Sequence, residues 1–345
     1  MLKIKTKLLI PGVLLLAIVA MLLINQPGRA KNEVVIYTSV DQVFSEPVLK
    51  EFEEKTGIKV LALYDSEAAK TTGLVNRLIA EKDAPKADVF WNGEFAQTML
   101  LKEKGILAAY KSPSAEGIPA QYTDAEGFWT GFGGRARVIL VNKNLLSADQ
   151  YPKSIYDLLK PEYAPDKIGI AYPMFGTAAT HAAALYADLG PDKGREFFED
   201  LSQRGIKVYD GNSVVRDMVV NGQLVAGLTD TDDALGAVEK GEPVEMLFPD
   251  QEEGGLGTLI VPNTVALISG ANHPEAGKQL IDYLLSSDVE KELVDAGWTN
   301  LSIRKSGEAA EAALMPEVKG MKVNLEDIYK QMDQSKEEMQ KIFVR

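Results

Sequence analysis

Short apolar runs alternate with stretches of helical periodicity along most of this chain. Glu33–Thr38 and Ile58–Tyr64 are rich in β-branched and aromatic residues, and a helix-like run from Phe44 to Lys55 lies between them. A strand, a helix and a second strand in this order favour a parallel pair, because parallel strands need a long crossover connection. The same alternation returns in both halves of the chain, so the sequence predicts an α/β fold.

Two long extended segments interrupt this alternation. Gly131–Asn142 and Leu256–Ser269 are each longer than a common strand of about five or six residues. We expect these two segments to cross between two α/β lobes and to form the hinge that joins them. A ligand cleft is expected between the lobes, because ligand sites commonly lie between domains.

The predicted boundaries assign residues 31–133 and 256–310 to lobe 1, and residues 134–255 and 311–345 to lobe 2. A chain of 345 residues is long enough for two domains with substantial cores. Residues 1–30 are set apart as a signal peptide or an N-terminal membrane anchor.

The first 30 residues have the pattern of an export signal. Lys3, Lys5 and Lys7 precede an apolar run from Leu8 to Ile24. The run is slightly short for a membrane-spanning helix, which needs about 20 apolar residues, and no clear cleavage site follows it. A cleaved signal and an uncleaved anchor that contacts the membrane through residues 8–24 both remain open. In either case we expect the rest of the chain to work in the periplasm or another extracytoplasmic space.

Composition and missing motifs exclude several classes of function. A net charge of −13 disfavours nucleic acid as a partner, since phosphate binding needs basic patches. The chain has no cysteine and only two histidines, which excludes disulfides, iron–sulfur clusters and multi-histidine metal sites. No nucleophile elbow, HExxH motif, P-loop or dinucleotide fingerprint is present. A hydrolase that uses two carboxylates has no specific support among 50 acidic residues, so we do not expect an enzyme.

An apolar run from Leu224 to Leu228 ends abruptly in the sequence Thr229-Asp230-Thr231-Asp232-Asp233. The run is typical of a buried strand, and open α/β sheets bind ligands at the carboxyl ends of their strands. Two carboxylates about 4 Å apart repel by roughly 4 kcal/mol at an effective dielectric constant near 20. Either the three acids spread into water as a helix cap, or a cation lies among them. Glu94 follows the strand-like run Ala87–Trp91 in the same way.

Several stretches resemble the ferric-ion-binding family of periplasmic solute-binding proteins, which serve ABC importers. These stretches keep the family order over roughly residues 33 to 305. They are Tyr37-Thr38-Ser39, Ala87-Asp88-Val89-Phe90 with Glu94, Gly134-Arg135-Ala136-Arg137-Val138, Asn221-Gly222 with Gly227-Leu228, and Pro274-Glu275-Ala276 with Ile281–Leu285. The resemblance implies a two-lobed, type II-like periplasmic-binding-protein fold whose lobes close over a ligand. It also implies delivery to a membrane permease, and we expect a monomer.

The resemblance implies a ligand site that departs from the family pattern. Iron-binding members use two adjacent tyrosines, a histidine and a glutamate, and the matching positions here are Asp232 and Asp233, Asp41, and Glu94. Only the glutamate is kept. The four carboxylates would form an all-oxygen metal set suited to iron, manganese, magnesium or calcium. The chain thus lacks the family's iron-binding tyrosine pair.

Other positions match the parts of the family that hold an anion. Arg135 and Arg137 match an arginine pair on the crossing strand, Gly176 and Thr177 match the anion loop, and Asn212 matches an accompanying asparagine. The complete predicted ligand set is Ser39, Asp41, Glu94, Arg135, Arg137, Gly176, Thr177, Asn212, Asp230, Asp232 and Asp233.

Two hypotheses for the ligand remain open. In the first, the carboxylates hold iron or another hard cation, which is cargo, and no resident cofactor is required. In the second, the importer role is the same but the ligand is a phosphorylated sugar, a phosphonate or a polyamine. Arg135, Arg137 and the helix start at Gly176 would then take an anionic group, and carboxylates would hold hydroxyl or ammonium groups.

Overall fold

The structure is a computed structural model that describes residues 32–65, 72–304 and 318–344. The predicted signal or anchor segment, residues 1–30, lies outside these residues. Within the described ranges, no helix combines the length and the apolar character needed to cross a membrane.

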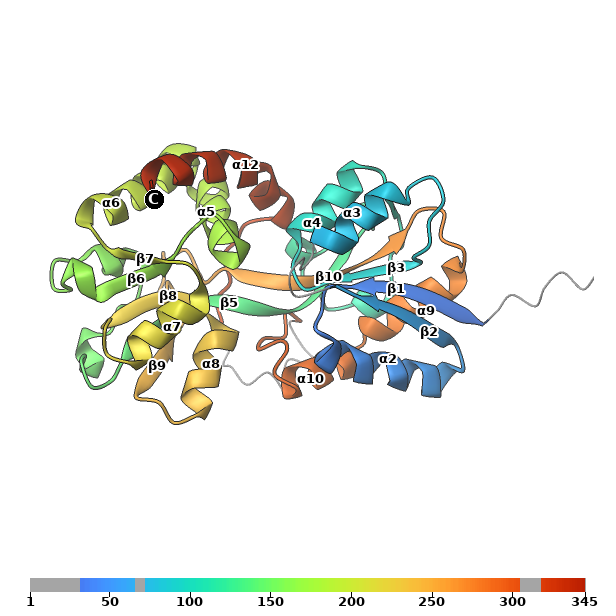
Figure 1. Ribbon diagram of the computed structural model, residues 1–345, viewed down its shortest axis with the longest axis horizontal. Helices are drawn as coiled ribbons and strands as arrows, with labels where there is room; N and C mark the ends of the chain where they lie inside the picture. Colours follow the sequence, from blue (N-terminus) through green and yellow to red (C-terminus); the bar gives the residue numbers. More distant parts are fainter. Residues whose placement is uncertain (1–31, 66–71, 305–317, 345) are drawn as a thin grey trace, which may run out of the picture.

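Two α/β lobes lie side by side along the long axis of the molecule (Figure 1). Their strands form one continuous path in the order β2-β1-β3-β10-β5-β8-β6-β7, while β4 pairs with β10 and β9 pairs with β5. In lobe 1, the parallel strands β1 (Glu33–Thr38), β2 (Lys59–Tyr64) and β3 (Val89–Asn92) confirm the strand–helix–strand unit predicted at the start of the chain. In lobe 2, β6 pairs in parallel with β7 and β8.

The remaining elements of lobe 1 are α2 (Gln42–Thr56), α3 (Thr72–Ala80), α4 (Ala96–Glu103), β4 (Leu107–Ala108), α9 (Pro274–Leu284) and α10 (Ser287–Asp295). Those of lobe 2 are β6 (Ile168–Ala171), α5 (Gly176–Leu189), α6 (Pro191–Arg204), β7 (Lys207–Tyr209), α7 (Asn212–Val220), β8 (Ala226–Asp230), α8 (Thr231–Glu239), β9 (Val244–Leu247) and α12 (Leu325–Ile342).

Two long strands join the lobes, as the extended segments predicted. β5 (Thr130–Asn142) pairs with β10 (Ile260–Ile268) up to Ala136 and with β8 from Arg137 onward. β10 also pairs with β3 of lobe 1. The predicted two-lobed architecture with two crossing strands is confirmed, and the change of pairing partner places Arg135 and Arg137 at the junction between the lobes.

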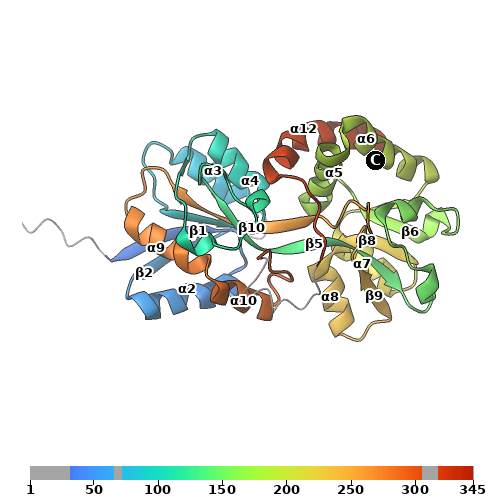
Figure 2. The ribbon, with the colours of Figure 1, turned by 180° about the vertical axis from the view of Figure 1, so that it is seen from behind.

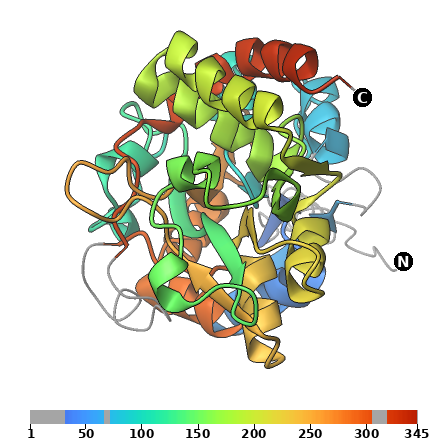
Figure 3. The same cartoon turned by 90° about the vertical axis from the view of Figure 1, so that its left-hand side faces the viewer.

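Helices cover both faces of the lobe 2 sheet. α5, α6 and α12 lie over one face, while α7 and α8 lie over the other (Figures 1 and 3). α12 contributes Ile328, Met332 and Met339 to the core and packs on α5. Before α12, the chain runs past the hinge strands (Figure 2). There the amide of Met321 donates a hydrogen bond to the carbonyl of Thr258, and the amide of Thr258 donates one to the carbonyl of Lys319.

A buried ion pair fastens the hinge strand to lobe 1. Glu290 on α10 is fully buried, and its Oε2 accepts a hydrogen bond of 2.7 Å from Nε of Arg304. Oε1 accepts a hydrogen bond of 2.8 Å from the amide of Gly133 on β5. Gly133 has a φ of 52° and a Cβ there would lie 2.8 Å from Thr299, so this turn of the hinge strand requires glycine. The start of the hinge is therefore held rigidly by lobe 1.

Arg304→Met tests this anchor. The substitution leaves the Glu290 carboxylate buried without its charge partner, so we expect the free energy of unfolding in urea to fall by about 3–5 kcal/mol. Lys330→Met removes one member of the exposed Lys330–Asp327 pair on α12 and should change that free energy little. Equal effects of the two substitutions would contradict the anchoring role.

Candidate functional site

The predicted site residues lie where strands of both lobes end. In lobe 1, Ser39 and Asp41 follow β1, and Glu94 follows β3. In lobe 2, Thr177 lies in the first turn of α5 beyond β6, and Asp232 lies in the first turn of α8 directly after β8. Because parallel strands present their carboxyl ends at one edge of a sheet, each lobe contributes one set of these residues to the side where α/β proteins bind ligands.

Ser39 links two strand ends of lobe 1. Its hydroxyl donates a hydrogen bond of 2.6 Å to Oδ1 of Asn92 and accepts one of 3.0 Å from the amide of Gly93. Ser39 and Asp41 also line a pocket of about 340 Å3 at the start of α2, together with Tyr64. Ser39 therefore positions the loop after β3, at the edge of that pocket.

Glu94 caps the following helix. Its two carboxylate oxygens accept hydrogen bonds from the amides of Ala96 (2.9 Å) and Gln97 (3.2 Å), in the first turn of α4. Burial raises the pKa of Glu94, and these two amide hydrogen bonds act in the opposite direction. The side chain is thus engaged by its own helix.

Four of the predicted residues form a closed polar network inside lobe 2. Nη1 of Arg137 lies 2.7 Å from Oδ1 of Asp230 and 2.8 Å from Oδ1 of Asn212. The amide of Asn212 donates to Oδ2 of Asp230 at 2.8 Å, and the hydroxyl of Thr177 donates to the same oxygen. Arg137 and Asp230 are only 2% and 4% exposed. The network therefore ties β5, β8, α5 and α7 together, which is a scaffold role.

The other two acids after β8 have separate cationic partners. Oδ2 of Asp232 lies 3.3 Å from Nη1 of Arg135, and Oδ1 of Asp233 lies 2.9 Å from Nη1 of Arg216. Of the two possibilities left open for this acidic stretch, the structure has the one with cations among the acids. Arg216 was not among the residues predicted from the sequence. It lies on α7, the helix that precedes β8.

The predicted metal set is not assembled in this conformation. Over the described residues, no three His, Cys, Asp or Glu side chains lie close enough together to hold a metal ion. Glu94 caps α4 in lobe 1, while Asp232 and Asp233 pair with different arginines in lobe 2. Each of these three carboxylates therefore has a partner of its own in this conformation.

Arg135 is the predicted residue that contacts both lobes. Besides Asp232 of lobe 2, its guanidinium contacts the carbonyl oxygen of Gly93 in lobe 1, with 3.4 Å between Nη2 and that oxygen. Its side chain remains 23% exposed. Both contacts are long for charged hydrogen bonds, which typically measure about 2.7–2.9 Å. Arg135 is therefore a loosely paired cation at the junction of the lobes.

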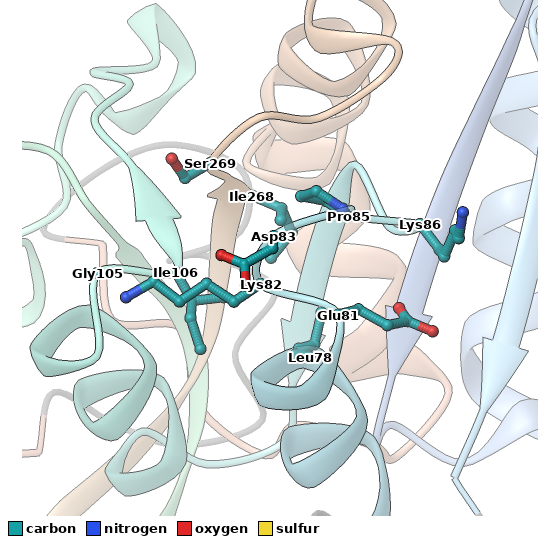
Figure 4. Close-up of a pocket in the computed structure, with 10 residues that line it drawn as sticks. All are labelled: Leu78, Glu81, Lys82, Asp83, Pro85, Lys86, Gly105, Ile106, Ile268 and Ser269. Carbon is teal, nitrogen blue, oxygen red and sulfur yellow. The ribbon is translucent and has the colours of Figure 1, made fainter.

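A separate, small pocket lies in lobe 1 (Figure 4). It measures about 120 Å3 and lies beside Pro85 and Lys86, before the start of β3. Two of its charged groups have partners: Glu81 pairs with Arg77, and Lys82 donates to the carbonyl of Lys104. The pocket thus lies at the end of β3 opposite to the predicted site.

Asp233→Asn tests how a buried charge affects stability. Burial, and then the neighbouring Asp232, raise the pKa of Asp233 from 3.8 to about 6. The folded state therefore binds this proton more tightly than the unfolded state, and the contribution of Asp233 to the free energy of unfolding should fall as pH rises from about 4 to about 6. Urea denaturation should show the variant gaining stability relative to wild type between pH 4 and pH 7. An unchanged difference would contradict this assignment.

Comparisons with known proteins agree with this architecture. The chain is 27% identical over 203 residues to the "Fe(3+)-binding periplasmic protein" of Serratia marcescens, and this match covers 59% of the chain but only 58% of that relative. It is 24% identical over 285 residues to the "Putative 2-aminoethylphosphonate-binding periplasmic protein" of Salmonella typhimurium, covering 80% of both proteins. The fold matches the ferric binding protein from Campylobacter jejuni with a TM-score of 0.75 and 22% identity, over 90% of the chain and all of that structure.

A family model supports the same assignment. The model described as bacterial extracellular solute-binding protein matches residues 84–324, which is well over half of the chain. This match includes most of both lobes and both crossing strands, and it confirms the resemblance found in the sequence. The chain therefore belongs to the family of bacterial extracellular solute-binding proteins.

Proposed function

We propose that this protein is the extracytoplasmic binding component of an ABC importer and that it captures a small zwitterion with a phosphonate or phosphate group and an amine. The two lobes close over the ligand and carry it to a membrane permease. The protein works in the periplasm, either released from its signal segment or tethered by it. No catalytic step is involved.

The loosely paired guanidinium of Arg135 carries this proposal. A planar guanidinium offers two parallel N–H groups that match two oxygens of a phosphonate or phosphate. Its contacts to Asp232 and Gly93 measure 3.3 and 3.4 Å, and part of the side chain reaches solvent. A doubly charged anion can replace these long contacts with shorter and stronger ones.

Asp232 suits the other end of such a ligand. Its Oδ2 faces Arg135, whereas its Oδ1 is buried and accepts no hydrogen bond from the described residues. An unsatisfied buried carboxylate oxygen is unfavourable by about 1–3 kcal/mol or more. An ammonium group would supply the missing donor, so one acid and one arginine together favour a zwitterion. The Salmonella relative, by its name, supports this ligand class.

Ferric ion is the second candidate, and the name of the Serratia relative favours it. To form a metal site, Asp232 and Asp233 would have to leave Arg135 and Arg216. Such a change leaves two guanidiniums without their partners near a trivalent cation, which electrostatics opposes. We therefore place the zwitterion first.

Arg135→Gln should weaken binding of 2-aminoethylphosphonate roughly tenfold to hundredfold, because a hydrogen bond to a charged group contributes about 1.5–3 kcal/mol. Isothermal titration calorimetry in the presence of a chelator measures the change. Arg135→Lys is the matched control: it keeps the charge but loses the two-pronged geometry, so its affinity should fall between those of wild type and Arg135→Gln.

Thermal-shift measurements on the wild type distinguish the two candidates. If thermal stabilisation of the wild type appears with ferric citrate and vanishes with chelator, while 2-aminoethylphosphonate and inorganic phosphate give none, the zwitterion proposal is wrong. Arg135→Gln would then be expected to strengthen metal binding by removing a nearby positive charge.

A further inference from the structure

Trp298 lies beside the candidate site but belongs to none of the sequence motifs. It follows α10 in lobe 1, and its Nε1 donates a hydrogen bond of 2.9 Å to Oδ1 of Asn263 on the hinge strand β10. The indole also contacts the ring of Phe44 on α2, with 5.3 Å between the ring centroids. The ring is therefore held from two directions by lobe 1.

The indole packs against the groups that hold Arg135. The guanidinium carbon of Arg135 lies 6.0 Å from the centroid of the Trp298 ring, within the range of a cation–π interaction. The ring also covers Gly93, where a Cβ would lie only 3.1 Å from Cζ2 of Trp298. Gly93 in turn provides the carbonyl that accepts from Nη2 of Arg135. Trp298 and Gly93 together form a platform under the guanidinium.

This platform and Asp232 act on Arg135 from different lobes. Trp298 and Gly93 belong to lobe 1, while Asp232 stands in the first turn of α8 in lobe 2. An anion that displaces Asp232 would leave the platform contact in place. The guanidinium would then keep its orientation while its hydrogen-bonding edge changes partner.

The segment that carries Trp298 is also connected to α8. Oδ1 of Asn300 accepts a hydrogen bond of 2.8 Å from the hydroxyl of Thr231, the first residue of α8, and both residues are buried. Thr231 immediately precedes Asp232. The platform and the acid that pairs with Arg135 are thus held in register across the junction of the lobes.

We infer that Trp298 is a positioning residue of the ligand site, which orients the Arg135 guanidinium for an anionic group through its ring face. This inference rests on the proposed function, because it concerns the same arginine. It adds a residue from outside the family motifs that sets the affinity for the anionic end of the ligand.

Tryptophan emission provides a direct readout of this role. The chain has three tryptophans. Trp91 and Trp129 are 0% and 2% exposed, whereas Trp298 is only partly buried and lies against a charged group. A change of partner at Arg135 should therefore alter the emission of Trp298. Trp129→Phe should keep the ligand-induced emission change, and Trp298→Phe should abolish it.

Affinity measurements with 2-aminoethylphosphonate and with inorganic phosphate test the inference itself. We expect a small loss of affinity in Trp298→Phe and a larger loss, roughly three- to thirtyfold, in Trp298→Leu, since phenylalanine retains a weaker ring face and leucine has none. Both probes should lose affinity by a similar factor, because both reach Trp298 only through Arg135. In the Arg135→Gln background, Trp298→Leu should cause little further loss.

Several outcomes decide the matter. The positioning role is wrong, and the proposed function stays intact, in either of two cases. In the first, Trp298→Leu lowers the affinity equally with and without Arg135. In the second, Trp298→Leu binds with wild-type affinity while Arg135→Gln binds poorly. If the wild type binds neither probe, both proposals fail together. If Trp298→Leu does not fold, Trp298→Phe and Gly93→Ala provide the test. The methyl group added in Gly93→Ala displaces the Trp298 ring without removing it. Wild-type affinity in both variants would refute the inference.

Discussion

The pairing of three neighbouring acids, Asp230, Asp232 and Asp233, with three arginines governs the junction of the lobes. Asp230, Asp232 and Asp233 end β8 and begin α8, and unpaired carboxylates so close together would repel strongly. Arg137, Arg135 and Arg216 pair with them one by one. Because two of these arginines belong to β5 and one to α7, the charge balance holds these two elements around the end of β8 and the start of α8.

The three ion pairs differ in burial and therefore in what they can do. Arg137 and Asp230 are almost fully buried and share hydrogen bonds with Thr177 and Asn212, so separating them would leave charges without partners inside lobe 2. Arg135 and Asp232 are part-exposed, and pairs of this kind contribute little to stability, about 0–1 kcal/mol. The first pair suits a permanent scaffold, and the second can exchange its partner for a ligand at small expense in stability.

Much of the architecture could be predicted from the sequence. The apolar runs and helical spacing located the main strands and helices, because a strand buried on both faces or an amphipathic helix leaves a local pattern. The extended segments that form β5 and β10 predicted two lobes, because their unusual length is also visible in the sequence. For the site, the sequence indicated positions along the chain and not the partners of each side chain. The candidate residues lie at strand ends, and their ligand role stays a prediction. In the structure Glu94 caps α4, and Arg137, Thr177, Asn212 and Asp230 bind one another.

The sequence by itself determined that three carboxylates follow a buried strand and that a cation had to lie among them or water had to surround them. Only the tertiary structure decided which cations these are. Arg216 is 17 residues from Asp233, Arg135 is 97 residues from Asp232, and Trp298 contacts Arg135 from the segment after α10. Such pairings depend on how the crossing strand, α7 and the segment after α10 are placed in space. Electrostatic interactions between side chains act over a few ångströms, whatever the separation of the residues along the chain.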